Sequence, residues 1–398
     1  MTEFKTIVVG NGLIGSAAGR YLSQLGEHVA IIGQAEPTDD TTHDGVFASH
    51  YDQRRLTHVT GRGGPWTIVK RNAVADYRAL EAQSGMAFYD PVGFIMTLPA
   101  QMRERPDSPH QTAIQHGIPH RFYLAGDRSW CDKFPDYTFP DSHAILYEPD
   151  PAGTIDPRAM RQAQNIVAKA NGATIINALV TKIRKQQGIM TVSTLGGDSY
   201  RARKVLLATG AFTNCYDLLP HKLALIPKTE VIILGEVSES DAKHLSRLPT
   251  LNYNLDDPQI EEGYLTPAAR HANGRYYVKF GANSLLDQFT DELAQIQRWF
   301  REGDSDALLP AMRRALTEIM PTTNFLSFQT KRCIITRTAS TYPMIDQVAE
   351  GLFVAVGGNG GSAQCAGEWG KISAELIHSN HWSSIIPRTI LQARLKGE

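Results

Sequence analysis

Residues 4–33 read FKTIVVGNGLIGSAAGRYLSQLGEHVAIIG, and they predict a strand, a tight turn, a helix and a second strand. Residues 7–9 form a short β-branched run of the kind found in buried parallel strands. The next segment carries apolar residues at helical spacing and stops at Gly26, before the apolar run at 29–32. This order of elements predicts the start of an α/β fold with a parallel sheet.

The turn after the first strand is a G-x-G-x-x-G motif made by Gly10, Gly12 and Gly15, with Leu13 and Ile14 inside it. Gly10 permits the sharp turn, Gly12 lets the backbone approach a pyrophosphate, and Gly15 lets the helix pack on the sheet. The helix N-terminus adds free N–H groups and the positive end of the helix dipole. In this context the motif predicts a dinucleotide site rather than a plain glycine-rich turn.

The usual acidic partner of the ribose is absent from its expected place. A carboxylate is expected at the end of the second strand, and Gly33 stands there. Gln34 or Glu36 could substitute for it, or backbone and water could hold the ribose.

Composition favours an ordinary globular protein of about two domains. The chain has 398 residues, 42% of them hydrophobic and 20% charged. A net charge of −1 gives no reason to expect nucleic acid or an anionic membrane as a partner, and no apolar run approaches the ~20 residues that span a bilayer. Four scattered cysteines without metal spacing favour a reduced, cytoplasmic setting. We expect a monomer or a small homo-oligomer.

The polar segment 34–65 is predicted to line a cofactor, because it gathers basic and imidazole side chains directly after the first βαβ elements. They are His43, His50, His58, Arg54, Arg55 and Arg62. The alternative is a solvated surface loop. Residues 66–84 are predicted to form an amphipathic helix ending near Gly85. Residues 88–98 look like a hairpin, and 99–149 gave no assignment.

Residues 156–211 are predicted to return to the first domain. Asp156 and Pro157 are typical of a helix start, and strands are predicted at 173–176, 180–183, 190–194 and 204–208. The last strand runs into Thr209 and Gly210, small residues at a sheet edge where a ligand can lie.

Residues 216–333 are predicted to form a β-rich second domain. The predicted strands are 230–237 and 275–280, and the predicted helices are 287–301 and 308–320. Strands at 333–336 and 352–356 follow, and the second runs into the glycine-rich turn 357–361, another place for close backbone approach to a ligand.

At this point the chain resembles the D-amino-acid oxidase and sarcosine oxidase class of FAD-dependent oxidoreductases. Four ordered stretches carry the likeness: the N-terminal motif, SHYDQRRLTHVTGRGG (49–64), KVLLATGAF (204–212), and KRCIITRTASTYPMID (331–346) with VAVGGNGGSAQCAGEWGK (354–371). The resemblance implies a Rossmann-like FAD-binding domain built from 1–90, 150–215 and 334–398. A β-rich (α+β) substrate domain, 91–149 and 216–333, is inserted into it.

The resemblance also implies which residues hold FAD. They are Gly10, Gly12, Leu13, Ile14, Gly15, Gly33, Gln34, Ser49, His50, Arg54, Arg55, Val180, Thr209, Gly210, Gly358, Asn359, Gly360, Gly361 and Ser362. Cys333 matches a cysteine that some relatives link to the flavin; the alternative, which we favour, is a small buried hydrophobe and non-covalent FAD.

The implied reaction is oxidation of a C–N bond in an amine or amino acid. A hydride passes to flavin N5, the imine hydrolyses, and O₂ takes the electrons to give H₂O₂. His50 and Arg54 match groups beside the isoalloxazine. Lys279 matches a lysine that promotes the reaction with O₂, where a fixed cation stabilises developing negative charge. The alternative is a solvated strand lysine.

Three positions depart from the sarcosine oxidase pattern. Thr57 and Gln364 replace an arginine and a lysine that bind the substrate carboxylate, and Asn283 replaces a histidine near the substrate. Two lost cations argue against a sarcosine-like substrate bound in the same way. Either the substrate lacks a carboxylate, or another arginine binds it, such as Arg270, Arg275 or Arg337.

Three other functions compete with an oxidase. The first is an FAD-dependent dehydrogenase that uses an acceptor other than O₂. The second is a flavin-binding subunit without turnover of its own. An NAD-only dehydrogenase is disfavoured, because the second glycine-rich turn at 357–361 fits a flavin better.

Overall fold

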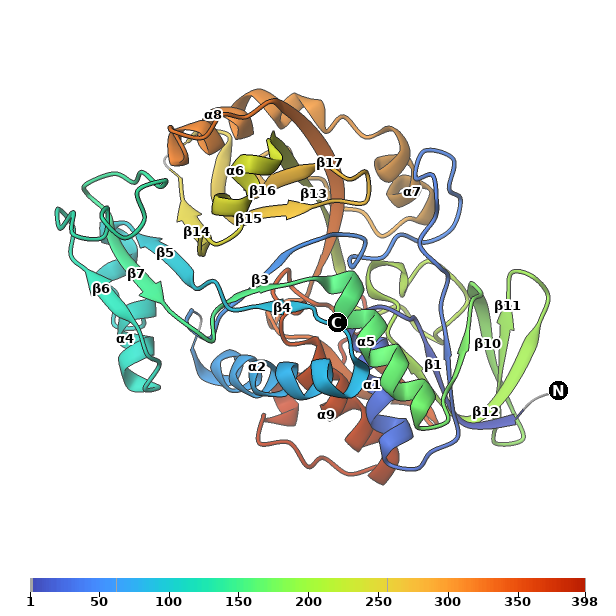
Figure 1. The fold of residues 1–398 in the computed structure, drawn as a ribbon. Helices are drawn as coiled ribbons and strands as arrows, with labels where there is room; N and C mark the ends of the chain where they lie inside the picture. Colours follow the sequence, from blue (N-terminus) through green and yellow to red (C-terminus); the bar gives the residue numbers. More distant parts are fainter. Residues whose placement is uncertain (1–2, 62, 256, 398) are drawn as a thin grey trace.

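The computed structural model describes residues 3–61, 63–255 and 257–397. Its first sheet has a parallel centre in the order β9 (Thr174–Ile176), β2 (Val29–Ile32), β1 (Glu3–Val9), β12 (Ser199–Leu207) and β19 (Leu352–Val356). Antiparallel strands β10 (Val180–Gln186), β11 (Ile189–Thr194) and β18 (Met344–Ala349) extend it. The predicted βαβ start is therefore confirmed, and the sheet occupies the lower part of Figure 1.

Both faces of the first sheet are covered. Val8 and Ile31 pack toward helices α1 (Leu13–Gln24), α2 (Gly64–Ser84) and α9 (Ala366–Ser379). Ile7 and Val9 point the other way, into a core shared with β10 and β11. This double burial explains why the strand sequence is continuously apolar.

Helix boundaries follow their local signals. Helix α2 ends at Gly85, which is left-handed with φ +68°. Asp156 caps α5 (Pro157–Ala170), and its side chain accepts a 2.9 Å hydrogen bond from Ala159 N. Both predicted helices are therefore confirmed.

The second sheet forms the upper part of Figure 1 and continues to its left edge. Its order is β17 (Ser327–Arg337), β13 (Ile226–Val237), β16 (Tyr276–Ser284), β15 (Ile260–Arg270), β14 (Thr250–Asn254), β5 (Phe94–Leu98), β7 (Ala144–Glu148) and β6 (Arg121–Tyr123). All neighbours are antiparallel except β14 and β5. Helices α6 (Glu239–Leu245), α7 (Leu293–Glu302) and α8 (Leu309–Ile319) accompany it.

The unassigned region 99–149 supplies strands β6 and β7 and two short helices, α3 (Ala100–Arg103) and α4 (Pro109–Gln115). The predicted domain boundary between residues 333 and 334 falls inside β17, which runs unbroken along β13 to Arg337. The division into two domains remains an interpretation of the sequence, and β17 crosses it.

Two sequence predictions are wrong. Residues 88–98 do not form a hairpin, because the chain turns at Pro91 and at Gly93, whose φ is +88°. Strand β4 (Tyr89–Asp90) joins a small sheet with β8 (Gly153–Ile155) and β3 (Arg55–Thr57), whereas β5 enters the second sheet. The helix predicted from residue 287 begins only at Leu293, because the Asp287 side chain binds Ser284 N and Lys228 instead.

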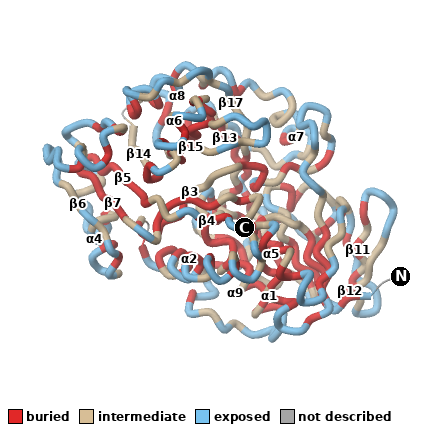
Figure 2. The backbone as a smooth tube through the Cα atoms, viewed as in Figure 1, coloured by how far each residue is buried: buried red, intermediate tan, exposed pale blue. Residues whose placement is uncertain are grey.

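The two faces of the second sheet differ in polarity. On β13, Val231 and Ile233 point into the main core beside the second sheet, with Phe280 and Leu316. The alternate residues Lys228, Glu230 and Ile232 lie on the other face. Figure 2 shows buried backbone in both lobes. No helix within the described ranges is long and apolar enough to cross a membrane.

Candidate functional site

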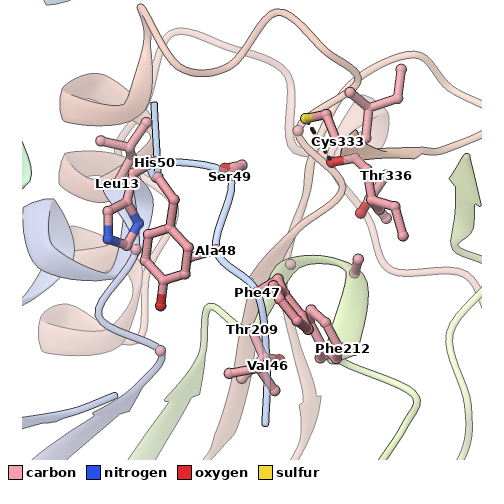
Figure 3. Close-up of a pocket in the computed structure, with 18 of the residues that line it drawn as sticks. Leu13, Val46, Phe47, Ala48, Ser49, His50, Thr209, Phe212, Cys333 and Thr336 are labelled. Carbon is pink, nitrogen blue, oxygen red and sulfur yellow. Dashed lines mark hydrogen bonds between the residues drawn. The ribbon is translucent and has the colours of Figure 1, made fainter. Parts of the chain in front are cut away.

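A cavity of about 480 Å³ lies between the carboxyl edge of the first sheet and the polar face of the second. The glycine-rich turn after β1, the segment 46–52, the turn at 209–212 and residues 331–336 of β17 all line it. Figure 3 shows Leu13 and His50 on one side of this space and Cys333 and Thr336 on the other. The segment 46–52 is therefore part of the site, and the prediction of a solvated loop is wrong for it.

The three motif glycines are required for different reasons. Gly10 has φ +106°, and a Cβ there would collide with the Ala208 carbonyl. A Cβ on Gly15 would collide with the Gly10 carbonyl, so this glycine closes the turn. Gly12 is the N-cap of α1, lines the cavity, and has no described atom within 4 Å of its Cβ position. The open space at Gly12 is the approach that a phosphate needs.

Most of the residues predicted from the sequence to hold the cofactor do line this cavity. They are Gly10, Gly12, Leu13, Ile14, Gly33, Gln34, Ser49, His50, Arg55, Val180, Thr209, Gly210, Gly358, Gly360 and Ser362, together with Cys333. Other predicted site residues lie behind this lining: Gly15, Arg54, Lys279, Asn359, Gly361 and Gln364. Arg62 lies outside the described residues.

Apart from Arg55 Nε, which is ion-paired with Asp52, four polar atoms of the cavity residues have no hydrogen-bond partner within the described parts of the chain. They are Asn11 Oδ1, His50 Nδ1, Tyr51 Oη and Ser362 Oγ. Buried polar atoms are rarely left unpaired in folded proteins. Together with the exposed N-terminus of α1, they fit a long ligand with polar groups along its length, as FAD has.

The missing ribose carboxylate has a structural explanation. A Cβ on Gly33 would collide with the backbone of Asn11, so no acidic side chain fits there. Gln34 lines the cavity and accepts a 3.2 Å hydrogen bond from Val46 N, whereas Glu36 forms an ion pair with Arg158. Asp40 also lines the cavity and was missed, because it lies in a segment without periodicity.

Asp52 lines the cavity and binds two cationic side chains. Its carboxylate lies 2.7 Å from Lys279 Nζ and 3.0 Å from Arg55 Nε, and Lys279 also donates to the Arg54 carbonyl. Burial would raise the pKa of Asp52, but Lys279 and Arg55 outweigh it and hold that pKa well below its usual range. Burial lowers the pKa of Lys279 to about 8 although Asp52 opposes the shift. Lys279 is 2% exposed, so the solvated alternative is wrong.

Neighbouring arginines have different partners. Arg54 donates to Thr154 Oγ1 at 3.0 Å and lies 3.5 Å from Asp90, and it is not among the residues that line the cavity. Arg55 lines the cavity and donates to the Ser49 carbonyl at 3.0 Å. Of these two predicted residues Arg55 lines the cavity and Arg54 does not, and the place of Arg54 beside the isoalloxazine stays a prediction.

His50 is buried and lines the cavity. Burial, with Arg161 and Arg158 nearby, lowers the pKa of His50 to about 3, so its imidazole is neutral at physiological pH. Burial also raises the pKa of the Cys333 thiol above its usual value, although Arg55 opposes the shift. The site therefore presents a neutral imidazole and a protonated thiol to a ligand.

The three positions that depart from the family pattern are bound to protein groups. Gln364 Oε1 accepts a 2.8 Å hydrogen bond from His58 N, and the Thr57 hydroxyl lies 3.4 Å from that of Tyr77. Asn283 Oδ1 accepts from Lys228 at 2.9 Å and from Arg337 at 3.2 Å. The Thr57 and Gln364 side chains thus have protein partners, and a role of Gln364 in the reaction stays a prediction.

Comparisons with known proteins agree with this geometry. Residues 5–376 match the family described as FAD dependent oxidoreductase. N-methyl-L-tryptophan oxidase of Yersinia pestis (strain Pestoides F) is 25% identical over 264 residues, which are 66% of this chain and 67% of that protein.

Solved structures share the fold over nearly the full length. NikD, an unusual amino acid oxidase essential for nikkomycin biosynthesis, has a TM-score of 0.76 at 18% identity and covers 99% of this chain and 98% of its own. Glycine oxidase from Geobacillus kaustophilus has a TM-score of 0.74 at 16% identity over 100% of both chains. L-proline dehydrogenase from P. horikoshii has a TM-score of 0.74 at 16% identity over 98% of this chain and 97% of its own.

At such identities the structural likeness establishes the fold alone. The family match covers nearly the whole chain, and the glycine-lined cavity has the polar atoms and the helix N-terminus that the cofactor requires. The chain therefore belongs to the family of FAD-dependent oxidoreductases, with FAD as its cofactor.

Proposed function

We propose that the protein oxidises a C–N bond of a small amine or amino acid and passes the electrons to O₂. The observation that carries this proposal is the cavity itself, where the glycine-rich edge of one sheet meets a face of another that presents buried charges. Relatives whose names describe N-methyl-L-tryptophan oxidase and glycine oxidase support the choice of amines as substrates.

Bound FAD would supply the two-electron chemistry, and the residues of this chain would place and tune it. The N-terminus of α1, opened by Gly12, would hold the pyrophosphate. His50 would offer a neutral polar contact, because its pKa is about 3. The Asp52–Lys279 pair would keep a fixed, water-shielded charge next to the reacting ring.

Arg337 is the best candidate to bind a substrate carboxylate. Among the three arginines that could replace the lost cations, Arg275 pairs with Glu236 at the surface and Arg270 is exposed. Arg337 is half-buried on the polar face of the second sheet, and Asn283 is its one hydrogen-bond partner among the described side chains. This supports an amino acid as the substrate.

A dehydrogenase that uses another acceptor is the second candidate function. The specific observation in its favour is that the charge of Lys279 is already met by Asp52 at 2.7 Å, which reduces the field available to a nascent superoxide. We also propose that the protein is cytoplasmic and is a monomer or a small homo-oligomer. The four free cysteines support the cytoplasmic location.

Replacement of Gly12 by valine tests where FAD binds. The Cβ of the introduced valine would enter the open space beside the N-terminus of α1, so we expect purified Gly12→Val to lack flavin absorbance that the wild-type protein has. Gly367→Ala is the matched control, because Gly367 also has free space at its Cβ position but lies inside α9. A yellow Gly12→Val protein with normal FAD content would contradict this placement.

Acid precipitation tests how the flavin is attached. Since the Cys333 thiol has a raised pKa and little thiolate, we expect non-covalent FAD and a colourless pellet with flavin in the supernatant. Yellow colour that stays in the wild-type pellet and disappears from the Cys333→Ala pellet would show a covalent link instead.

Lys279→Met tests how electrons leave. The variant keeps much of the side-chain length and removes the charge, so we expect reoxidation by O₂ to slow far more than reduction by substrate. Loss of one preorganised electrostatic group costs about 3–4 kcal/mol. Because the pKa of Lys279 is about 8, wild-type reoxidation should also slow as the pH rises through that value, and the variant should show no such step.

Stopped-flow measurement of flavin reduction and of flavin reoxidation shows which half-reaction depends on Lys279. Lys182→Met is the control, because Lys182 is an exposed lysine on a strand. Equal slowing of both half-reactions would mean that Lys279 only shapes the site. Wild-type reoxidation that is slow with O₂ and fast with an artificial dye would favour the dehydrogenase.

A further inference from the structure

Glu230 stands apart from the other buried acidic residues. Four are buried among the described residues: Glu27, Asp52, Glu148 and Glu230. The first three carboxylates are each met by hydrogen bonds or ion pairs, for example Glu148 by Val59 N and Thr60 N at 2.8 Å. The Glu230 carboxylate forms no hydrogen bond or ion pair with any side chain or backbone group in the described ranges, although the residue is only 7% exposed. Buried carboxylates without a partner are strongly disfavoured, so a partner is expected.

The position of Glu230 on β13 places it near the cavity. On β13 it lies two residues from Ile232 and pairs in register with Cys333 on β17, and both of these residues line the cavity. Residues two apart on a strand, and residues paired across strands, share a face. Glu230 therefore lies on the face of the second sheet that borders the cavity.

Most of the charged side chains around Glu230 already form ion pairs with other residues. Lys228 forms an ion pair with Asp287, and Arg55 with Asp52. Arg337, which also acts electrostatically on Glu230, has no carboxylate partner among the described residues and meets only the amide of Asn283. Lys331, on the same face, donates to the Tyr51 carbonyl at 2.8 Å. Glu230 and Arg337 are thus an anion and a cation without a partner of opposite charge, which is a pattern that a zwitterion would satisfy.

We propose that Glu230 binds the ammonium group of the substrate, while Arg337 binds its carboxylate, so that the enzyme takes an amino acid as a zwitterion. This inference rests on the proposed function and names the substrate class of that same site. It assigns Glu230 a role in specificity that depends on its charge.

Burial raises the pKa of Glu230 although Lys228 and Arg55 oppose the shift. Cation binding should therefore strengthen as the pH rises and the carboxylate ionises. Among the groups around it, Asp52 stays ionised and Tyr264 and Cys333 stay protonated. The other charged neighbours are Lys228, Arg55, Arg337 and Asp287. Lys279 lies on the same face with a pKa of about 8, and it titrates in the wild type and in a Glu230 variant alike, so the difference between the two proteins isolates Glu230.

The test uses the FAD-loaded protein and two simple probes, dimethylammonium and acetate, which stand for the two halves of the substrate. Binding is followed by the perturbation of the flavin absorbance spectrum. We expect Glu230→Gln to weaken dimethylammonium binding by at least about tenfold and to remove the part of its pH dependence that Glu230 contributes, with acetate binding kept or tightened. Arg337→Met should do the reverse.

Glu262→Gln is the matched control, because Glu262 is an exposed carboxylate of the same sheet, on β15, which β16 separates from β13. Dimethylammonium binding that is equal in wild type and Glu230→Gln would overturn the proposal, as would equal weakening of both probes. A screen of amines and amino acids on the wild type distinguishes failure of the proposed function from failure of the role of Glu230. If no amine or amino acid bleaches the flavin, the proposed function fails; if one does and Glu230→Gln binds it normally, only the role of Glu230 fails.

Discussion

The arrangement of this molecule depends on one buried carboxylate. Asp52 lies in the segment that lines the cavity, and it binds Lys279 from the second sheet and Arg55 from its own segment. The side chains of Asp52 and Lys279 are 6% and 3% exposed. Removing one member of a buried pair leaves an uncompensated charge and costs about 3–5 kcal/mol. The pair therefore holds the second sheet against the cofactor segment.

The second sheet, which this ion pair anchors, has one apolar face and one charged face. One face of β13 and β16 is apolar and closes a conventional core. The other carries Lys228, Glu230 and Lys279, which a sheet buried in a core would not contain. The two lysines are tolerated because Lys228 pairs with Asp287 and Lys279 with Asp52, and the Glu230 carboxylate because a polar cofactor and substrate are expected between the two sheets. The unpaired remainder, Glu230 and Arg337, is where substrate recognition is expected.

Local features of this fold could be predicted from the sequence, and long-range contacts could not. The glycine-rich turn at 10–15 and the helix ending at Gly85 depend on residues that are close together in sequence, so both were predicted correctly. The Arg54 side chain binds Thr154, which is 100 residues away in sequence, and the sequence did not indicate this contact. The partner of Lys279 is 227 residues away, and no spacing rule in one sequence indicates it. The region 99–149 lacks periodicity because its short strands complete a sheet begun elsewhere.

We expect FAD to lie between the carboxyl edge of the first sheet and the charged face of the second. A crystal structure of the FAD-loaded protein is the decisive measurement. It should show density for the pyrophosphate at the N-terminus of α1 beside Gly12 and for the isoalloxazine between His50 and the face that carries Lys279 and Cys333. Density that placed the flavin ring outside this cavity, or away from the Asp52–Lys279 pair, would contradict it.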